Sequence, residues 1–238
     1  MAELSHHTGN GLEDLYAILK ARDVMVEQLR LDLTCAPSNI NVRIILDGQR
    51  DVTEFHIPPH ESRAVYKDLK DLMQAVGEST NVKYIWMLCQ LNFWAHFCVQ
   101  LCLALCVNHT MSALRFELSG IGSSRSQSDF DTILTQVGVM ITRNKGLKYF
   151  ACKYSDLRHF LSNRTFWCLE GAAAALKRNR TLEHLEMGGI DVRSARGLIQ
   201  GLIQPLTADA NGRQSNSTLV KLDLTLRKQV NGNLLKLL

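Results

Sequence analysis

The stretch that decides the fold is GAAAALKRNRTLEHLEMGGID, residues 171–191. Its first half is a run of alanines ending near Leu176, an apolar and small-residue pattern that suits a closely packed helix. Its second half has a different period. Leu182, Leu185 and Met187 form an apolar-x-x-apolar-x-apolar frame, typical of a short strand that buries alternate side chains. The stretch therefore predicts a helix followed directly by a strand.

The strand frame recurs along the whole chain. Its first apolar residue is Val26, Val52, Val82, Met111, Leu147, Leu182 or Leu219. Successive frames start between 26 residues (26 to 52) and 37 residues (182 to 219) apart. Helix-like stretches precede the frames, at 11–22, 63–79, 93–107, 128–144, 169–179 and 197–206. A period in this range indicates a repeat architecture.

Residues 171–191, with their helix followed by Asn-x-Thr-Leu-x-x-Leu-x-Met, resemble the leucine-rich repeat. More narrowly, they resemble the ribonuclease-inhibitor-like subtype, also found in the sensor regions of NLR receptors. Gly188–Ile190 departs from that pattern, because the family has a further Asn there. The resemblance is diffuse over 26–97 and clearer over 98–238, where the C-terminus looks like an incomplete repeat.

The resemblance implies an α/β fold. Specifically, we expect one leucine-rich-repeat domain over 1–238, a horseshoe-shaped solenoid of about seven repeats. Parallel strands would line its concave face and helices its convex face. The apolar end of the chain, NGNLLKLL at 231–238, is expected to be loosely held or to dock on something.

Composition limits the class of protein. Of the 238 residues, 46% are hydrophobic and 21% charged, as in folded globular domains. The net charge is only +4 and the basic residues are scattered, so we expect no nucleic-acid partner. The apolar stretch 93–107 is shorter than the roughly 20 residues of a membrane span, so we expect no membrane partner. Seven cysteines cannot all pair, and no signal peptide is visible, so we expect a cytoplasmic protein.

Three cysteines, Cys98, Cys102 and Cys106, lie four residues apart in HFCVQLCLALCVNHT at 96–110. Thiols at this step drift around a helix and lack a fourth ligand for a tetrahedral metal site. Aligned on the repeat, Cys98 and Cys102 fall on apolar helix positions, whereas Cys106 falls on a more exposed one. We therefore predict that the first two pack in the core and that Cys106 is the candidate reactive thiol. No metal and no cofactor are expected.

No catalytic motif is recognisable in the sequence. SGIGSS at 119–124 lacks the Lys-Ser/Thr ending of a phosphate-binding loop, and no metalloprotease or triad pattern occurs. We expect a protein that is not an enzyme. Four Asn-x-Thr triplets start at Asn108, Asn163, Asn179 and Asn216. Because three of them precede a strand frame, we interpret them as repeat turns rather than as glycosylation sites.

The outward residues of the strand frames are the candidate binding surface. Tyr84, Trp86, Arg115 and Tyr149 would form its centre, and these residue types dominate interface hot spots. The full set of candidate partner-binding residues is Arg30, His56, Tyr84, Trp86, Arg115, Tyr149, Lys153, His184, Glu186, Lys221 and Asp223.

Function follows here from the resemblance alone. It implies a non-enzymatic module for protein–protein interaction, in intracellular signalling or innate-immune-type regulation. One alternative is a GTPase-activating protein for a Ran-like GTPase, although the acidic tail of that family is missing. Another is a cytoskeletal adaptor of the tropomodulin kind. The partner is expected to be a protein; its identity and the oligomeric state stay open.

Overall fold

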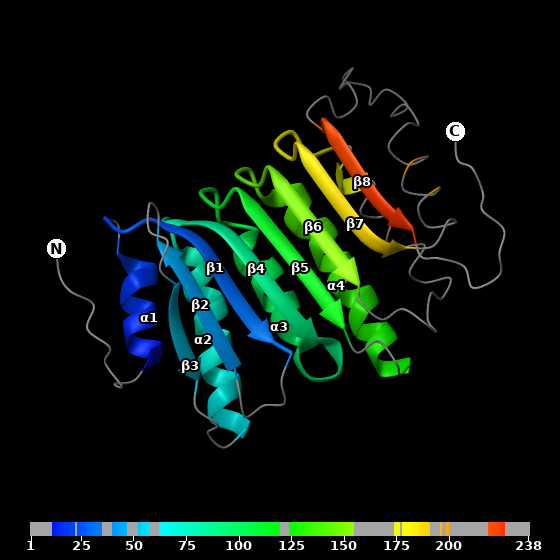
Figure 1. Cartoon of the computed structure of the whole chain (residues 1–238). Helices are drawn as coiled ribbons and strands as arrows, with labels where there is room; N and C mark the ends of the chain where they lie inside the picture. Colours follow the sequence, from blue (N-terminus) through cyan, green and yellow to red (C-terminus); the bar gives the residue numbers. More distant parts are fainter. Residues whose placement is uncertain are drawn as a thin grey trace.

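A computed structural model describes residues 11–21, 23–34, 40–46, 52–57, 62–119, 124–154, 174–176, 178–190, 196, 199 and 219–226. These residues form one sheet of eight strands in the order β3-β2-β1-β4-β5-β6-β7-β8. Helices α2, α3 and α4 lie along one face of the sheet, and α1 lies against β3 and α2 (Figure 1). The α/β class is therefore confirmed.

The strands are β1 (Val26–Leu33), β2 (Ile40–Leu46), β3 (Val52–Ile57), β4 (Val82–Gln90), β5 (Ala113–Ser119), β6 (Tyr149–Tyr154), β7 (His184–Ile190) and β8 (Lys221–Leu226). The helices are α1 (Gly11–Lys20), α2 (Ser62–Glu78), α3 (Leu91–Leu105) and α4 (Ser124–Arg143). Four of the predicted helices are confirmed by these elements. In the predicted helix 169–179, residues 174–176 and 178 are helical, and in 197–206 residue 199 is helical; the rest lies outside the described residues.

Six of the seven strand frames lie side by side and parallel, in β1 and β4 to β8. Their register aligns the predicted apolar positions across the sheet. Leu29 is level with Ile85, and the same row continues through Leu114, Phe150, Leu185 and Leu222. The period-2 alternation of each frame therefore gives one continuous apolar face.

The frame at Val52 is a correction to the expected order. A consecutive repeat would place its strand between β1 and β4, but β1 pairs directly with β4. Val52 instead begins β3 at the sheet edge, and β2 runs antiparallel to both β1 and β3. The stretches 34–39 and 47–51 are too short for a crossover helix, whereas short links suit hairpins. The expectation of parallel strands throughout is therefore wrong at this end.

The core fills the layer between the sheet and its helices. Phe116 and Phe150, on neighbouring strands, are fully buried and meet edge to face with centroids 5.9 Å apart. Each buried side chain of this size contributes about 1.5–3 kcal/mol. None of the helices that the structure describes is long and apolar enough to cross a membrane.

The cysteines of α3 belong to this core. Cys98 and Cys102 are fully buried, as predicted. Cys106 is also buried, at 8% exposure, and its thiol donates to the Cys102 carbonyl oxygen at 3.3 Å. Burial raises the pKa of the Cys106 thiol despite the nearby positive charge of Arg143. The expectation that Cys106 is the exposed thiol is therefore wrong.

Candidate functional site

A buried asparagine precedes each of four strands, and three of the four share one hydrogen-bonding pattern. In the first of these three, Asn108 Nδ2 donates to the carbonyl oxygens of Gly77 and Ser79, at 3.0 and 2.8 Å. Its Oδ1 accepts from the backbone N–H groups of Thr110 and Met111, at 3.0 and 2.9 Å. One side chain thus joins the end of α2 to the segment that enters β5. We call this arrangement the asparagine ladder and include Asn81, Asn108, Asn144 and Asn179 in it.

Asn144 and Asn179 repeat the arrangement. Asn144 Nδ2 donates to the carbonyls of Leu105 and Asn108, both at 2.7 Å, and Asn179 Nδ2 donates to Ile141 at 2.6 Å. Both Oδ1 atoms accept from the backbone two and three residues later. Each repeat is therefore anchored to the preceding one at the same height, which holds the strands in register.

Asn81 performs the same task from a shifted position. Its Nδ2 donates to the carbonyls of Ile18, Ala21 and Val24, at 2.8, 2.7 and 2.7 Å. The position three residues before Val82 holds Ser79, which hydrogen-bonds Asn81. The asparagine can therefore move two residues along the chain and still anchor the repeat.

The ladder also bears on the Asn-x-Thr triplets. Asn108 and Asn179 are only 5% and 4% exposed, and their amide nitrogens donate inward. The repeat-turn interpretation is confirmed for these two. The sequence pattern indicates only the turn backbone, whereas in the structure the asparagine side chain also bridges two segments. In the sequence, this bridge is indicated by an Asn that recurs three residues before the frames at 111, 147 and 182. Asn163 and Asn216 lie outside the described residues.

The outward side chains of the parallel strands form three rows on the side of the sheet opposite α2, α3 and α4, which we call the strand face (Figure 1). The first row is Gln28, Tyr84, Ala113, Tyr149, His184 and Lys221. The second row is Arg30, Trp86, Arg115, Ala151, Glu186 and Asp223. The third row includes Asp32, Leu88, Glu117 and Lys153.

All candidate residues except His56 lie in these rows. His56 is on β3, paired with Asn41 of β2, and so lies two strands beyond β1. The structure does not describe its side chain. Leu88, a half-exposed apolar residue below Trp86, is a member of the strand face that the sequence analysis did not name.

Trp86 is the centre of one cluster on the strand face. The guanidinium carbon of Arg30 lies 4.3 Å from the Trp86 ring centroid, and that of Arg115 lies 4.9 Å from it. Both distances are within the range of cation–π attraction. Arg115 is also tied to Glu117, with its Nε donating to Oε1 at 2.9 Å. The indole therefore has a charged neighbour on the strand at either side.

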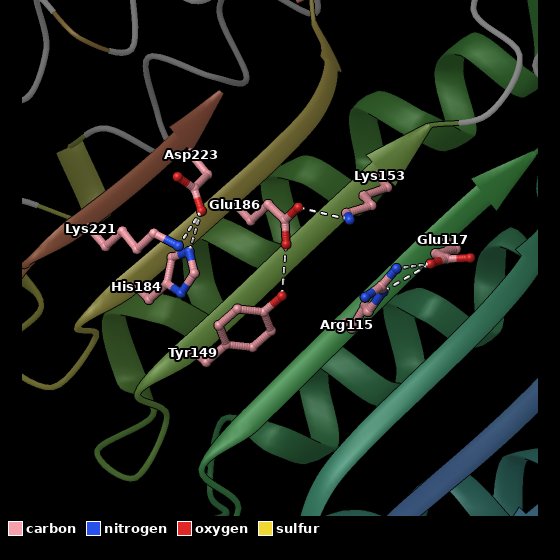
Figure 2. A network of polar contacts seen from close by, with 8 residues as sticks. All are labelled: Arg115, Glu117, Tyr149, Lys153, His184, Glu186, Lys221 and Asp223. Carbon is pink, nitrogen blue, oxygen red and sulfur yellow. Dashed lines mark hydrogen bonds and ion pairs between the residues drawn. The ribbon is translucent and has the colours of Figure 1, made fainter. Parts of the chain in front are cut away.

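Tyr149 belongs to a second cluster that bridges β6 and β7. Its hydroxyl donates to Glu186 Oε2 at 2.8 Å, and Lys153 Nζ pairs with Glu186 Oε1 at 2.8 Å (Figure 2). Burial opposes ionisation of Glu186, but the hydrogen bonds from Lys153 and Tyr149 outweigh it and lower its pKa. The pKa of Tyr149 is strongly raised by burial and by donation to this carboxylate.

A third cluster joins β7 and β8. Asp223 Oδ2 lies 2.9 Å from His184 Nε2 and 2.8 Å from Lys221 Nζ (Figure 2). Hydrogen bonds from Lys221 and His184 lower the pKa of Asp223. The His184 ring also meets Tyr149 edge to face, with centroids 4.8 Å apart, so the second and third clusters are continuous.

The four residues expected to anchor a partner, Tyr84, Trp86, Arg115 and Tyr149, thus belong to two different clusters. Trp86 and Arg115 touch, and the pKa of Tyr84 is raised by burial while Arg115 opposes that rise. Tyr149 instead contacts Glu186 and His184. Within the described part of the chain, no group of three His, Cys, Asp or Glu side chains could hold a metal ion.

Solved structures similar to this chain include two of low sequence identity. No family model and no curated protein matches the chain. A tropomodulin C-terminal domain from Caenorhabditis elegans is similar over 80% of this chain and 90% of its own, at 9% identity and a TM-score of 0.45. A structure described as leiomodin-1 actin-binding site 2 is similar over 57% and 70%, at 16% identity and a TM-score of 0.41.

Proposed function

We propose that this chain is a non-enzymatic leucine-rich-repeat protein of the ribonuclease-inhibitor-like subtype that binds a protein partner on its strand face. In this proposal the strands line the concave side of a solenoid and the helices its convex side. Six parallel strands in register and the recurring asparagine ladder support the repeat assignment. The frame at Val52 is not one of these parallel repeats, because it lies in the β2–β3 hairpin at the sheet edge.

The observation that carries the proposal is the Trp86 cluster with its neighbours. Trp86, Arg30 and Arg115 are half-buried, on a sheet face over which none of the described helices lies. Trp, Tyr and Arg contribute most to interface hot spots. Cation–π and ion-pair contacts already hold these side chains, so binding would order them at a lower entropic cost.

The charge pattern favours a protein over a nucleic acid. Arg115 is paired with Glu117, Lys153 with Glu186, and Lys221 with Asp223. A phosphate backbone requires unopposed cations in a row, whereas alternating signs suit a protein surface with its own alternating charges.

Affinity capture with mass spectrometry tests the proposal. The bait is the full chain, compared with Trp86→Ala/Tyr149→Ala and with Leu103→Ser/Val107→Ser. The last pair is a matched control, because Leu103 and Val107 are exposed on or just after α3, at 45% and 71%. A partner retained by the wild type and the control but lost by the strand-face variant is expected. Partners that the strand-face variant retains would contradict the proposal.

The other expected functions have direct assays. Stimulated GTP hydrolysis by a Ran-like GTPase would identify a GTPase-activating protein. Altered actin assembly at pointed ends would identify a cytoskeletal adaptor of the tropomodulin kind. A role in cytoplasmic signalling or innate-immune-type regulation depends on the identity of the captured partner.

A further inference from the structure

The two arginines beside Trp86, Arg30 and Arg115, differ in how many hydrogen bonds they donate within the chain. Arg115 donates from Nε and from a terminal nitrogen to Glu117 Oε1. Arg30 has a much weaker partner, since its terminal nitrogen lies 3.8 Å from Asp32 Oδ2, beyond hydrogen-bonding distance. Arg115 is therefore committed within the chain, whereas Arg30 is held mainly by its contact with the indole.

The carboxylate beside Arg30, that of Asp32, is hydrogen-bonded to Thr34. Asp32 Oδ1 accepts from the backbone N–H of Thr34 at 3.2 Å and from its hydroxyl at 2.6 Å. These bonds hold the carboxylate at the end of β1 and turn it toward the chain that follows. Asp32 is thus close enough to attract the Arg30 guanidinium electrostatically, but it accepts no hydrogen bond from it.

Two neighbouring donors at this place are buried without acceptors. Within the described part of the chain, Arg30 Nε and Trp86 Nε1 have no hydrogen-bond partner. Donors buried in this way are uncommon in folded proteins and call for an explanation. The Arg30 guanidinium lies against the Trp86 ring, so both unmet donors belong to one contact pair on the second row of the strand face, here called the spot. The Arg30 side chain is still 27% exposed.

We propose that this spot recognises a carboxylate in an acidic segment of a protein partner. The inference rests on the proposed function and names the chemistry of the partner. The carboxylate would accept hydrogen bonds from the Arg30 guanidinium, whose planar fork matches it geometrically. The Trp86 ring and Leu88 provide the apolar surface against which the rest of the segment packs. Arg115, neutralised by Glu117, holds the indole from the other strand.

A random peptide library panned against the full chain tests the inference without knowledge of the natural partner. Parallel selections use the wild type, Trp86→Ala and the matched control Lys70→Gln, an exposed cation of α2 on the opposite side of the sheet. Clones lost on Trp86→Ala but kept on Lys70→Gln are the face-dependent set. One such peptide and its copy with Asp and Glu replaced by Asn and Gln are then titrated against Arg30→Gln, Arg30→Lys and the wild type. Circular dichroism and urea unfolding check that each variant is folded.

The inference predicts that the face-dependent set is enriched in Asp and Glu. Neutralising the peptide carboxylates, or the change Arg30→Gln, should weaken binding about tenfold or more. Arg30→Lys should restore only part of the affinity, because ammonium lacks the fork. Face-dependent clones that are neutral or basic would overturn this inference and leave the proposed function standing. A library with no face-dependent clone would contradict both.

Discussion

The hydroxyl of Tyr149 on β6 donates a hydrogen bond of 2.8 Å to the Glu186 carboxylate on β7. Lys153, on the same strand as Tyr149, holds the other oxygen of that carboxylate. Two neighbouring strands are therefore joined by side chains as well as by their backbones. This bridge makes the Tyr149 side of the strand face a fixed surface rather than a set of independent side chains.

The change Tyr149→Phe removes the donor and keeps the ring. We expect the pKa of Glu186 to rise, because the Tyr149 hydrogen bond is one of the interactions that lower it. The free energy of unfolding at neutral pH should fall by about 1 kcal/mol. A carboxyl NMR titration and urea unfolding measure the two effects. Tyr84→Phe is the control, and an unchanged Glu186 pKa in Tyr149→Phe would show that the bridge is absent in solution.

The Tyr149–Glu186–Lys153 bridge also predicts how the stability of the fold changes with pH. The folded-state pKa of Glu186 lies below its usual value, so the bridge stabilises the fold above the unfolded pKa. The contribution is lost as the pH falls from about 5 through the folded-state pKa. The urea midpoint of the wild type should therefore drop over this acid range more steeply than that of Glu186→Gln. Parallel curves for the two proteins would contradict the assignment.

Replacement of Asn108 by Ala should be among the most damaging single changes. It removes the side-chain partner of the Gly77 carbonyl and of two backbone N–H groups, while the Ser79 carbonyl keeps the Thr110 hydroxyl at 3.2 Å. We expect a loss of about 3 kcal/mol in the free energy of unfolding. The neighbouring exposed residue gives the control, and His109→Ala should change stability by less than about 0.5 kcal/mol. Equal urea midpoints for the two variants would rule out the ladder.

Gly77 lies where α2 packs closely against α3. α2 continues to Glu78, and a Cβ on Gly77 would lie 2.9 Å from the Cα of Ala104 on α3. Gly77→Ala should therefore push the two helices apart and cost about 1–3 kcal/mol. Lys70→Ala, on the exposed side of α2, is the control. Differential scanning calorimetry measures both, and a stabilised Gly77→Ala protein would disprove the close approach.

The thiols of α3 should resist alkylation in the folded protein. Cys98 and Cys102 are fully buried, and burial of Cys106 raises its pKa. Only the thiolate reacts, so native Cys106 should be alkylated by iodoacetamide far more slowly than in urea at the same pH. Mass spectrometry of the digested peptides compares the two rates. Native Cys106 that reacts as fast as it does in urea would restore it as a reactive thiol.

The strand frames were predictable because alternation with period two is a local property. The neighbours of Trp86 were not. In the order of the sequence, the frame of Val52 comes directly before that of β4, which would put its residue His56 rather than Arg30 next to Trp86. The hairpin of β2 and β3 removes that frame to the edge and brings β1 against β4. The pairing of β1 with β4 depends on contacts between strands distant in the sequence, which a local pattern does not contain.

The ladder and Cys106 were partly visible in the sequence. The recurring Asn could be read from the chain, but its acceptors belong to the preceding repeat and require the fold. The repeat alignment places Cys106 at the position that Lys177 has in a later repeat, and so predicts a more exposed site. A short thiol that donates to its own helical turn stays buried at a position where a long charged side chain would extend outward.

The central claim is that the strand face binds the partner, and the dissociation constant of the captured partner tests it most directly. The account predicts that Trp86→Ala/Tyr149→Ala weakens binding about a hundredfold or more, because two hot-spot side chains are lost. Leu103→Ser/Val107→Ser, on the opposite side of the sheet, should bind within about twofold of the wild type. Unchanged affinity in the strand-face variant together with lost affinity in the α3 variant would contradict the account.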